Sequence, residues 1–332
     1  MPLASAAMDA TRRAAGALLP RFDFTRPVLS ALGQTPLRSV TPATSAFRGV
    51  LELIKGRRDS LLIRDEDGRF AGLLTERDFL KLPLETGKVR RTKVSELMTP
   101  ATSLSTAPSE FTMLQCVEQM RDANVRHLPI VEDEQVKAVI GLNDVARHMS
   151  ETLNRRSGID EDVTVGDLLA ASAWSTPQQA NRGLPLSASV ETALERMRET
   201  HVHALLVTGE DVDFGIFTER DYVHNVLPYL WYEEQTPADV PLSRVARWAQ
   251  SDRGASRRLL QSIAADPALS TYRPEHVTCV EQATPVRDCL ALMLGNGLLY
   301  VPVLDELEHG TPSDIIALRD ITLFLARDTD GE

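Results

Sequence analysis

The sequence predicts an α/β protein of the α+β type, built from four copies of one strand–helix–strand–strand–helix unit. A stretch that begins at Phe70 recurs at Phe214; in both copies an apolar run of strand character meets Thr-Glu-Arg-Asp, and a helical pattern follows. The copies lie 143 residues apart (221 − 78), which is too long for one small repeat. Weaker copies occur at 137–144 and 314–320. We therefore group the predicted helices and strands into four repeats of this unit.

Repeat one, residues 36–92, shows the unit most clearly. A short strand ends at Val40, and the helix after it carries apolar residues at helical spacing, namely Phe47, Val50, Leu51 and Ile54. Strands at 60–63 and 70–74 flank an Asp-Glu-Asp-Gly turn that is typical of a hairpin. A second helix begins at Thr75 and ends before Pro83.

The other three repeats keep this order of elements and are predicted at 93–155, 184–232 and 240–327, with a polar linker at 156–183. Their first helices are expected at 108–122, 189–200 and 285–294, and their hairpin strands at 127–131 and 137–140, 204–207 and 213–217, and 298–303 and 315–318. The last repeat is stretched, because Asp221 and Asp320 lie 99 residues apart, whereas Asp78 and Asp144 lie 66 apart. The difference predicts an insertion at 246–276, of a kind that often contacts a partner.

One unit of this size buries too little apolar surface to be stable alone. We therefore expect the repeats to pair sheet against sheet into two modules, one at 36–155 and one at 184–327. Residues 1–35 form a separate arm that is rich in Arg, Ala and Leu and poor in acids. Such a composition is typical of a mitochondrial or plastid transit peptide, and the alternative is a disordered or partner-binding arm.

The net charge, the cysteine spacing and the longest apolar stretch argue against several kinds of partner and site. The formal net charge of −11 argues against nucleic acid and anionic lipid as partners. Three cysteines without C-x-x-C spacing argue against a disulfide framework or a zinc site and favour a reducing, intracellular compartment such as the cytoplasm. The apolar stretch at 290–304 is broken by Gly295-Asn296-Gly297 and is too short to insert into a membrane.

The Thr-x-x-Asp motif after a strand has two interpretations. As a helix cap it contributes about 1 kcal/mol and needs no ligand. The hydroxyl is lost at Gly141 and Ala317, however, while the carboxylate is kept in all four copies, as Asp78, Asp144, Asp221 and Asp320. Because a cap most needs the hydroxyl, this pattern favours a short carboxylate that accepts two ribose hydroxyls, beside helix amides that suit phosphate.

These motifs resemble those of CBS domains. The resemblance rests on Gly72-x-x-Thr75-x-x-Asp78, Gly215-x-x-Thr218-x-x-Asp221, the segment Val94–Pro100 and the segment His127–Val131, and it covers about residues 36–327. It implies four CBS repeats paired into two Bateman modules. Two such modules without an attached domain are similar to the gamma subunit of AMP-activated protein kinase and to stand-alone CBS-domain proteins.

The resemblance also implies nucleotide-binding residues. The aspartates would bind ribose, Thr75 and Thr218 would lie by sugar or phosphate, and basic residues at or near the motif would hold phosphate; these are Arg126, His127, His203, Arg77 and Arg220. Repeat two carries Ala138 and repeat four Asp314 in place of the motif glycine. A carboxylate there would repel phosphate, so the Asp320 site is expected to be empty.

The leading hypothesis is a non-catalytic, allosteric sensor that binds AMP, ADP or ATP and acts as a regulatory subunit on a protein partner or as a homodimer. The alternative is a structural subunit whose nucleotide sites are partly degenerate and empty. An enzyme is disfavoured because no nucleophile, base and oxyanion donors occur together. A metal is disfavoured because His201-x-His203 lacks a third ligand. Tyr229, Trp231 and Tyr232 are expected to pack in the core, with a docking surface as the alternative.

Overall fold

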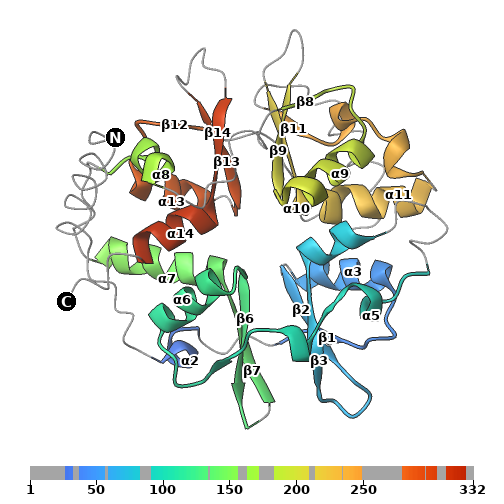
Figure 1. The fold of residues 1–332 in the computed structure, drawn as a ribbon, viewed down its shortest axis with the longest axis vertical. Coiled ribbons are helices and arrows are strands. Elements are labelled where there is room, and N and C mark those ends of the chain that lie inside the picture. The colour runs from blue at the N-terminus through green and yellow to red at the C-terminus, as the bar shows by residue number, and fades with distance from the viewer. Residues whose placement is uncertain are drawn as a thin grey trace. The chain divides into compact units, whose positions relative to one another are not determined.

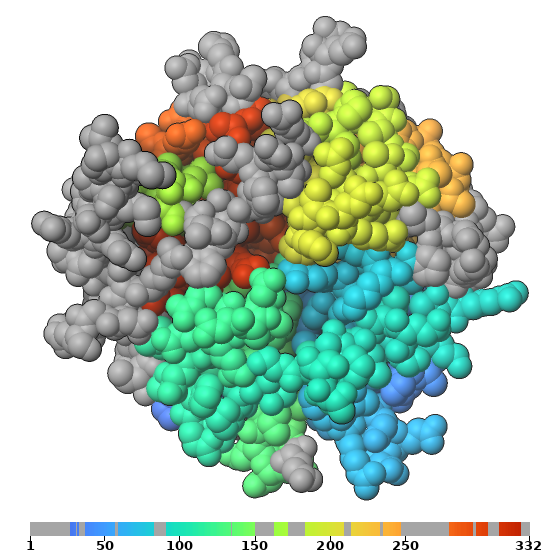
Figure 2. All heavy atoms as spheres, viewed as in Figure 1, coloured from blue at the N-terminus to red at the C-terminus, as the bar shows by residue number. Residues whose placement is uncertain are grey.

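The computed structural model describes most of the chain in twelve stretches. They are residues 27–32, 37–56, 59–82, 91–133, 135–155, 163–171, 183–208, 214–233, 235–248, 279–295, 297–304 and 312–326. The remaining residues are drawn as a thin grey trace in Figure 1 and as grey spheres in Figure 2. Most of the predicted arm and of the predicted insertion therefore lies outside the described residues.

The chain divides into two compact units, each made of segments far apart in the sequence. Unit 1 comprises residues 1–35, 105–175 and 279–332, and so holds repeats two and four. Unit 2 comprises residues 36–104 and 176–278, and so holds repeats one and three. These units differ from the predicted modules, which join repeats one with two and three with four. The sheet-to-sheet pairing of the modules concerns contacts between the units and stays a prediction.

In unit 2, repeats one and three each build a four-stranded sheet. The elements of repeat one are β1 (Ser39–Val40), α3 (Ala46–Gly56), β2 (Ser60–Arg64), β3 (Phe70–Thr75), η1 (Glu76–Lys81), α5 (Val94–Leu97), β4 (Thr99–Pro100) and η2 (Ala101–Ser103). Those of repeat three are β8 (Leu184–Pro185), α9 (Val190–Thr200), β9 (Ala204–Thr208), β10 (Gly215–Thr218), α10 (Glu219–Asp221), the π-helical turn η3 (Tyr222–Val226), α11 (Leu227–Glu233), η4 (Pro237–Asp239), η5 (Leu242–Arg244) and β11 (Arg247–Trp248). The strand orders are β1-β2-β3-β4 and β11-β10-β9-β8.

In unit 1, repeats two and four each build a three-stranded sheet, ordered β5-β6-β7 and β12-β13-β14. The elements are α2 (Val28–Leu32), β5 (Ala107–Pro108), α6 (Met113–Asp122), β6 (His127–Glu132), β7 (Gln135–Gly141), α7 (Leu142–Arg155), α8 (Val165–Ala171), β12 (Val280–Glu281), α13 (Val286–Gly295), β13 (Tyr300–Leu304), β14 (Pro312–Ala317) and α14 (Leu318–Ala326). Helix α14 packs against both α7 and α13 (Figure 1). The predicted α+β fold and the hairpin of every repeat are confirmed.

The fourth strand explains the motif glycine. In repeat one, Gly72 of β3 pairs with Pro100 of β4, and an added Cβ at Gly72 would lie 2.4 Å from the Thr99 carbonyl oxygen. Gly215 of β10 pairs in the same way with β11. Repeats two and four have no fourth strand in the part of the chain that the structure describes, and they carry Ala138 and Asp314 at this position. The glycine therefore serves strand pairing, and its loss is a poor reason to expect an empty site.

The short helix that begins each repeat packs on the neighbouring repeat of the chain. In unit 2, the Val94 amide of α5 donates to the Thr44 carbonyl at 2.8 Å, so the segment predicted to begin repeat two packs on repeat one. In unit 1, the Val28 amide of α2 donates to the Phe111 carbonyl at 2.8 Å. Adjacent repeats thus exchange their first segments.

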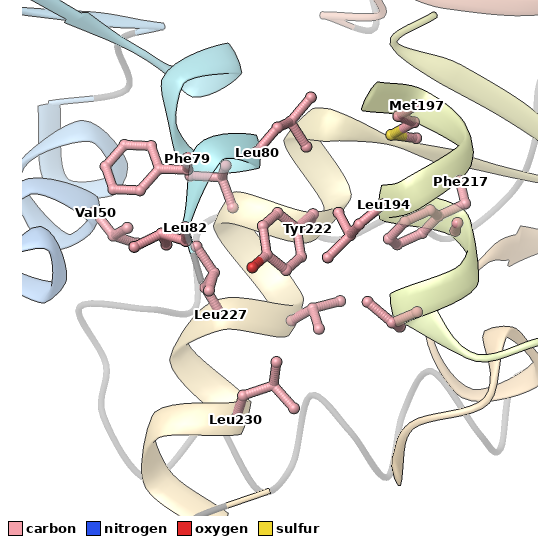
Figure 3. Packing of buried hydrophobic residues seen from close by; sticks show 14 of the residues in the cluster. Val50, Phe79, Leu80, Leu82, Leu194, Met197, Phe217, Tyr222, Leu227 and Leu230 are labelled. Carbon is pink, nitrogen blue, oxygen red and sulfur yellow. The ribbon is translucent and has the colours of Figure 1, made fainter. Parts of the chain in front are cut away.

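Apolar side chains hold the two repeats of each unit together. In unit 2, Tyr222 of η3 lies among Leu80 and Leu82 of repeat one and Leu194 and Leu227 of repeat three (Figure 3). All five side chains are at most 6% exposed, which makes this the joint between the repeats. Burial raises the pKa of the Tyr222 hydroxyl far above its usual value, so the ring acts as a neutral core residue.

The prediction that Tyr229, Trp231 and Tyr232 pack in the core is confirmed only in part. Trp231 is buried and makes an edge-on contact with the Phe47 ring, with ring centroids 4.9 Å apart. Tyr229 is partly buried against the same core, whereas Tyr232 is 75% exposed. The core prediction is confirmed for Trp231 and wrong for Tyr232, because the last turn of α11 carries it past the edge of the core.

Candidate functional site

The motif aspartate caps a helix in all four repeats. One oxygen of each carboxylate, Oδ2, accepts a hydrogen bond from the backbone amide three residues earlier. The amides and distances are Thr75 to Asp78 at 2.8 Å, Gly141 to Asp144 at 2.9 Å, Thr218 to Asp221 at 2.9 Å and Ala317 to Asp320 at 3.0 Å. The carboxylate is therefore the constant half of the cap. The expectation that a cap would most need the hydroxyl is wrong.

The same hydrogen-bonded box occurs outside the repeated motif. Thr164 and Asp167 form it at α8, and Thr236 and Asp239 form it at η4. Both of these boxes lie at the surface, whereas the Asp78, Asp221 and Asp320 side chains are at most 8% exposed. Thr-x-x-Asp is thus a local folding signal in both settings, and burial distinguishes the copies at Asp78, Asp221 and Asp320 from these two surface boxes.

A second backbone hydrogen bond places the residue before the hairpin strand against the motif. In every repeat, the donor is the amide of the residue that directly follows the Thr of Thr-x-x-Asp, or the Gly or Ala that replaces this Thr. The acceptor is the carbonyl of the residue just before the first strand of the hairpin. The pairs are Glu76 to Asp59 at 3.2 Å, Leu142 to Arg126 at 3.1 Å, Glu219 to His203 at 3.0 Å and Leu318 to Leu299 at 2.8 Å. The structure therefore places the backbone of Arg126 beside the start of the Asp144 helix and that of His203 beside the start of the Asp221 helix. His127 pairs in register with Gly141, three residues before Asp144.

Asp78 is engaged on both oxygens. Its Oδ1 lies 2.6 Å from the ammonium of Lys81, which also donates to the Leu97 carbonyl at 3.0 Å. The hydroxyl of Thr75 adds a 2.9 Å hydrogen bond to Oδ2. A ribose at Asp78 would have to displace the half-exposed Lys81 side chain. Asp221 has the corresponding bond from the Thr218 hydroxyl, at 2.6 Å, and is fully buried.

Glu76 joins repeat one to repeat three, a role that the sequence alone did not indicate. Its Oε1 lies 3.1 Å from Arg220 Nε and 2.7 Å from His224 Nε2, and its side chain is 3% exposed. Burial opposes ionisation, but Arg220 and His224 outweigh it and hold the pKa of the Glu76 carboxyl below its usual value. Arg220, predicted to bind phosphate, is therefore paired inside the protein.

A second carboxylate of the same kind lies in repeat three. Glu219 occupies the motif position of Glu76 and is fully buried, and its Oε2 lies 3.0 Å from His203 Nδ1. His203 was also predicted to face phosphate, and it faces a carboxylate instead. Arg77, the counterpart of Arg220, is half-buried at the start of η1. In unit 2, Arg220 thus pairs with a carboxylate across the joint, and His203 lies beside a carboxylate within repeat three.

The joint of unit 1 has different chemistry. Arg126 Nη1 donates to the Tyr300 hydroxyl at 3.0 Å, and Arg319 Nη2 donates to Asn124 Oδ1 at 2.7 Å. Burial lowers the pKa of the Arg319 guanidinium, the neighbouring Asp320 opposes this, and Arg126 lowers it further. The motif positions of Glu76 and Glu219 hold two leucines, Leu142 and Leu318.

Asp320 is a carboxyl group whose ionisation is disfavoured by its surroundings. Burial raises its pKa to about 6, against the opposing effects of the Ala317 amide and Arg319, and Asp314 raises it further. Asp314 is itself buried and accepts the Ile315 amide at 2.7 Å. Two carboxylates therefore share this end of β14, which leaves intact the predicted electrostatic reason for weak ribose or phosphate binding at Asp320.

Other chemistries receive no support from the described part of the chain. Within it, no group of three or more His, Cys, Asp or Glu could hold a metal ion. Burial raises the pKa values of Cys116, Cys279 and Cys289 to about 12, so these thiols are protonated at neutral pH. No helix with described residues is long and apolar enough to cross a membrane.

Comparisons with known proteins agree with this architecture. The model of the CBS domain matches residues 29–85, 94–151 and 184–227. The chain is 32% identical over 83 residues to the Arabidopsis thaliana CBS domain-containing protein CBSX3, mitochondrial, covering 25% of this chain and 40% of that protein. It is 23% identical over 293 residues to the Arabidopsis protein CBSCBSPB5, covering 85% of this chain and 50% of that protein. The chain thus spans about half the length of the curated relatives it matches.

A solved structure supports the fold. The Methanocaldococcus jannaschii protein proposed as an archaeal homologue of g-AMPK superposes with a TM-score of 0.63 at 16% identity, over 90% of this chain and 99% of that one. At this identity the similarity concerns the arrangement of the elements alone.

Proposed function

Because the model of the CBS domain matches three stretches of the chain, we propose that the protein is a non-catalytic regulatory protein that binds an adenine nucleotide, AMP, ADP or ATP. The observation that carries the proposal is the shared geometry of the four helix starts. In each, two hydrogen bonds from backbone amides recur: one amide donates to the motif carboxylate, and the next donates to the carbonyl of the residue before the hairpin strand. Helix amides suit phosphate, and a short carboxylate suits ribose hydroxyls.

Repeat two has the best set of groups for this role. Arg126 and His127 lie beside the start of the Asp144 helix, where His127 pairs in register with Gly141. A Cβ at Gly141 would lie 3.3 Å from His127 Cδ2 and 3.5 Å from Asp144 Oδ2. We therefore rank the Asp144 site first for binding, ahead of the Asp221 site and of the Asp78 and Asp320 sites.

Isothermal titration calorimetry of the full chain with adenosine, AMP, ADP and ATP tests the proposal. We expect Asp144→Asn to weaken binding at least 10-fold, because the amide can still cap the helix but cannot accept two ribose hydroxyls. Asp239→Asn is the matched control, since Asp239 forms the same box outside the repeated motif. Absence of heat with all four ligands at millimolar concentration would exclude the proposal.

We propose that the bound nucleotide acts on a protein partner or on a second copy of the chain. A difference of roughly 1–3 kcal/mol in partner affinity between ligand states is enough for regulation. Affinity purification with and without ATP, followed by native mass spectrometry, measures this difference. For location, the relative named as mitochondrial offers mitochondrial targeting as a hypothesis, which a fluorescent fusion with and without residues 1–35 tests.

A structural subunit is the second candidate, and the closed network of unit 2 favours it. The Glu76 cluster joins repeats one and three, and within repeat one Lys81 already engages the motif carboxylate of Asp78. If this role is correct, Asp78→Asn and Asp221→Asn leave assembly with a partner intact, whereas deletion of residues 249–276 abolishes it. The opposite pair of results would exclude it.

A further inference from the structure

Lys81 contacts the motif carboxylate of its own repeat. Its Nζ lies 2.6 Å from Asp78 Oδ1, while Asp78 Oδ2 accepts the Thr75 amide at 2.8 Å and the Thr75 hydroxyl at 2.9 Å. The Asp78 side chain is 7% exposed and the Lys81 side chain is 54% exposed. Both carboxylate oxygens are therefore engaged, one by the helix cap and the other by a side chain that reaches solvent.

The same ammonium group also holds the segment Val94–Pro100, which packs on repeat one. Lys81 Nζ donates to the carbonyl of Leu97, the last residue of α5, at 3.0 Å. Thr99 and Pro100 then form β4, which pairs with β3. One side chain thus joins the motif carboxylate of repeat one to the segment that supplies its fourth strand.

The helix cap does not require a lysine at this position. Three residues after the motif aspartate, the other repeats have Arg147, His224 and Leu323. Arg147 is exposed and Leu323 is buried in the core. His224 contacts Glu76 of repeat one. Because the aspartate caps the helix in all of these repeats, Lys81 is an addition to the cap of repeat one and has another role.

We propose that Lys81 makes an autoinhibitory contact, which closes the Asp78 carboxylate to ribose and links its opening to the segment Val94–Pro100. This regulation rests on the proposed function, because the ligand that it excludes is the sugar of the nucleotide. A ribose hydroxyl can reach Asp78 Oδ1 only if it displaces the ammonium group. A neutral hydroxyl in that place forgoes the attraction between the two charges, which burial of the carboxylate strengthens.

Opening the Asp78 carboxylate has a consequence for the neighbouring segment. A ligand that displaces Lys81 from Asp78 also draws its ammonium group away from the Leu97 carbonyl. Ligand binding in repeat one should therefore loosen the residues around β4. By linkage, a change that releases this segment should favour the ligand to the same extent.

Calorimetry on the full chain with adenosine and AMP tests the closure. Lys81→Met removes the ammonium group and keeps an unbranched side chain. We expect the Asp78 site to bind adenosine about 5-fold tighter or more in this variant than in the wild type, and the gain to vanish in the double variant Lys81→Met/Asp78→Asn. Lys81→Arg keeps the charge and should show no gain. The control is Lys137→Met, which removes a lysine 3.6 Å from Glu132 in repeat two and should bind as the wild type does.

Hydrogen exchange of the full chain without ligand tests the link to the segment. We expect the amides of Met98 and Thr99 to exchange several-fold faster in Lys81→Met than in the wild type, and at the wild-type rate in Lys137→Met. Thermal unfolding of each variant confirms that it is folded. Unchanged exchange at Met98 and Thr99 in Lys81→Met would overturn the link.

The outcomes separate this proposal from the proposed function. Equal adenosine binding by the wild type and Lys81→Met would overturn the autoinhibitory contact and leave the proposed function standing. A gain that depends on Asp78, in a protein whose wild type binds neither ligand, would support the contact and reject nucleotide binding by the wild type. An equal gain in Lys137→Met would show a general effect of charge and would overturn the contact. No heat in any variant would overturn both proposals.

Discussion

The joints of the two units share one repeated motif and differ in the groups that meet across them. In unit 2, the Glu76 carboxylate of repeat one lies within 3.1 Å of both Arg220 and His224 of repeat three. In unit 1, leucines stand at the motif positions of Glu76 and Glu219, and Arg126 and Arg319 donate to Tyr300 and Asn124 across the joint. One joint therefore contains a buried carboxylate paired with a guanidinium group, whereas the other contains hydrogen bonds from arginine to uncharged acceptors.

Removal of the Glu76 charge should have the largest effect on stability. Glu76→Gln leaves Arg220 beside a neutral amide in a buried site, and loss of one partner from a buried pair costs about 3–5 kcal/mol. Glu52→Gln is the control, because the Arg38 and Arg48 partners of Glu52 are half-exposed to exposed, and such a pair contributes at most about 1 kcal/mol. Urea unfolding of both variants measures the difference. A loss no larger than that of the control would contradict the closed joint.

In unit 1, Asp320→Asn should raise the free energy of unfolding, whereas Glu76→Gln lowers it. Since burial raises the pKa of this carboxyl from 3.8 to about 6, ionised Asp320 costs stability at pH 7. The amide keeps an acceptor for the Ala317 amide, so we expect a gain of about 1–3 kcal/mol in the free energy of unfolding. A loss of stability in urea at pH 7 would show that the charge is needed.

The same two carboxyls predict opposite responses to pH. The stabilising effect of Glu76 is present above its unfolded pKa of 4.5 and is lost as the pH falls below that value, because its folded pKa is lowered. The cost of Asp320 disappears as the pH falls through about 6, because its folded pKa is raised. Hydrogen exchange between pH 7 and pH 5 should therefore slow in α14 and stay level in η1, after correction for intrinsic rates. Parallel changes in both elements would refute this contrast.

Gly72→Ala tests the explanation of the motif glycine. The added Cβ would lie 2.4 Å from the Thr99 carbonyl oxygen, so β4 has to shift, and we expect a cost of about 1–3 kcal/mol. Ala138→Gly, at the same motif position in a three-stranded sheet, should cost at most about 1 kcal/mol. Thermal unfolding compares the two. Equal costs would mean that the fourth strand is not the reason for the glycine.

Thr218→Val should have the smallest effect. It removes the 2.6 Å hydrogen bond to Asp221 but keeps the amide that Asp221 also accepts, so we expect a loss of about 1 kcal/mol. Repeats two and four lack this hydroxyl and still form the cap. A loss above about 3 kcal/mol would assign Thr218 a larger role than capping.

Much of the fold could be predicted because its signals are local. Period-two apolar runs, turn residues and the repeated motif located every hairpin, and the aspartate located every helix start. The composition of the units could not be predicted, since it depends on which helix faces meet across more than 100 residues of chain. The exchange of first segments was equally hidden, because Val94–Pro100 packs on the preceding repeat rather than on its own.

The candidate site was predicted in part, and the misses have a common cause. The four aspartates lie at helix starts, and Arg126 and His127 lie at the start of β6 beside one of these helices, while their role in binding stays a prediction. Glu76, His224 and Arg319 were overlooked, because their roles arise only where two repeats meet. One sequence signal pointed to a difference between the joints. Repeats two and four have Leu where repeats one and three have Glu, whereas repeat four keeps the arginine that follows.

Double-mutant cycles measured by urea unfolding of the full chain test the contrast between the units most directly. We predict a larger coupling free energy between Glu76 and Arg220 than between Arg126 and Tyr300, because only the first pair joins a carboxylate to a guanidinium group. Equal coupling in the two pairs, or none between Glu76 and Arg220, would contradict the account.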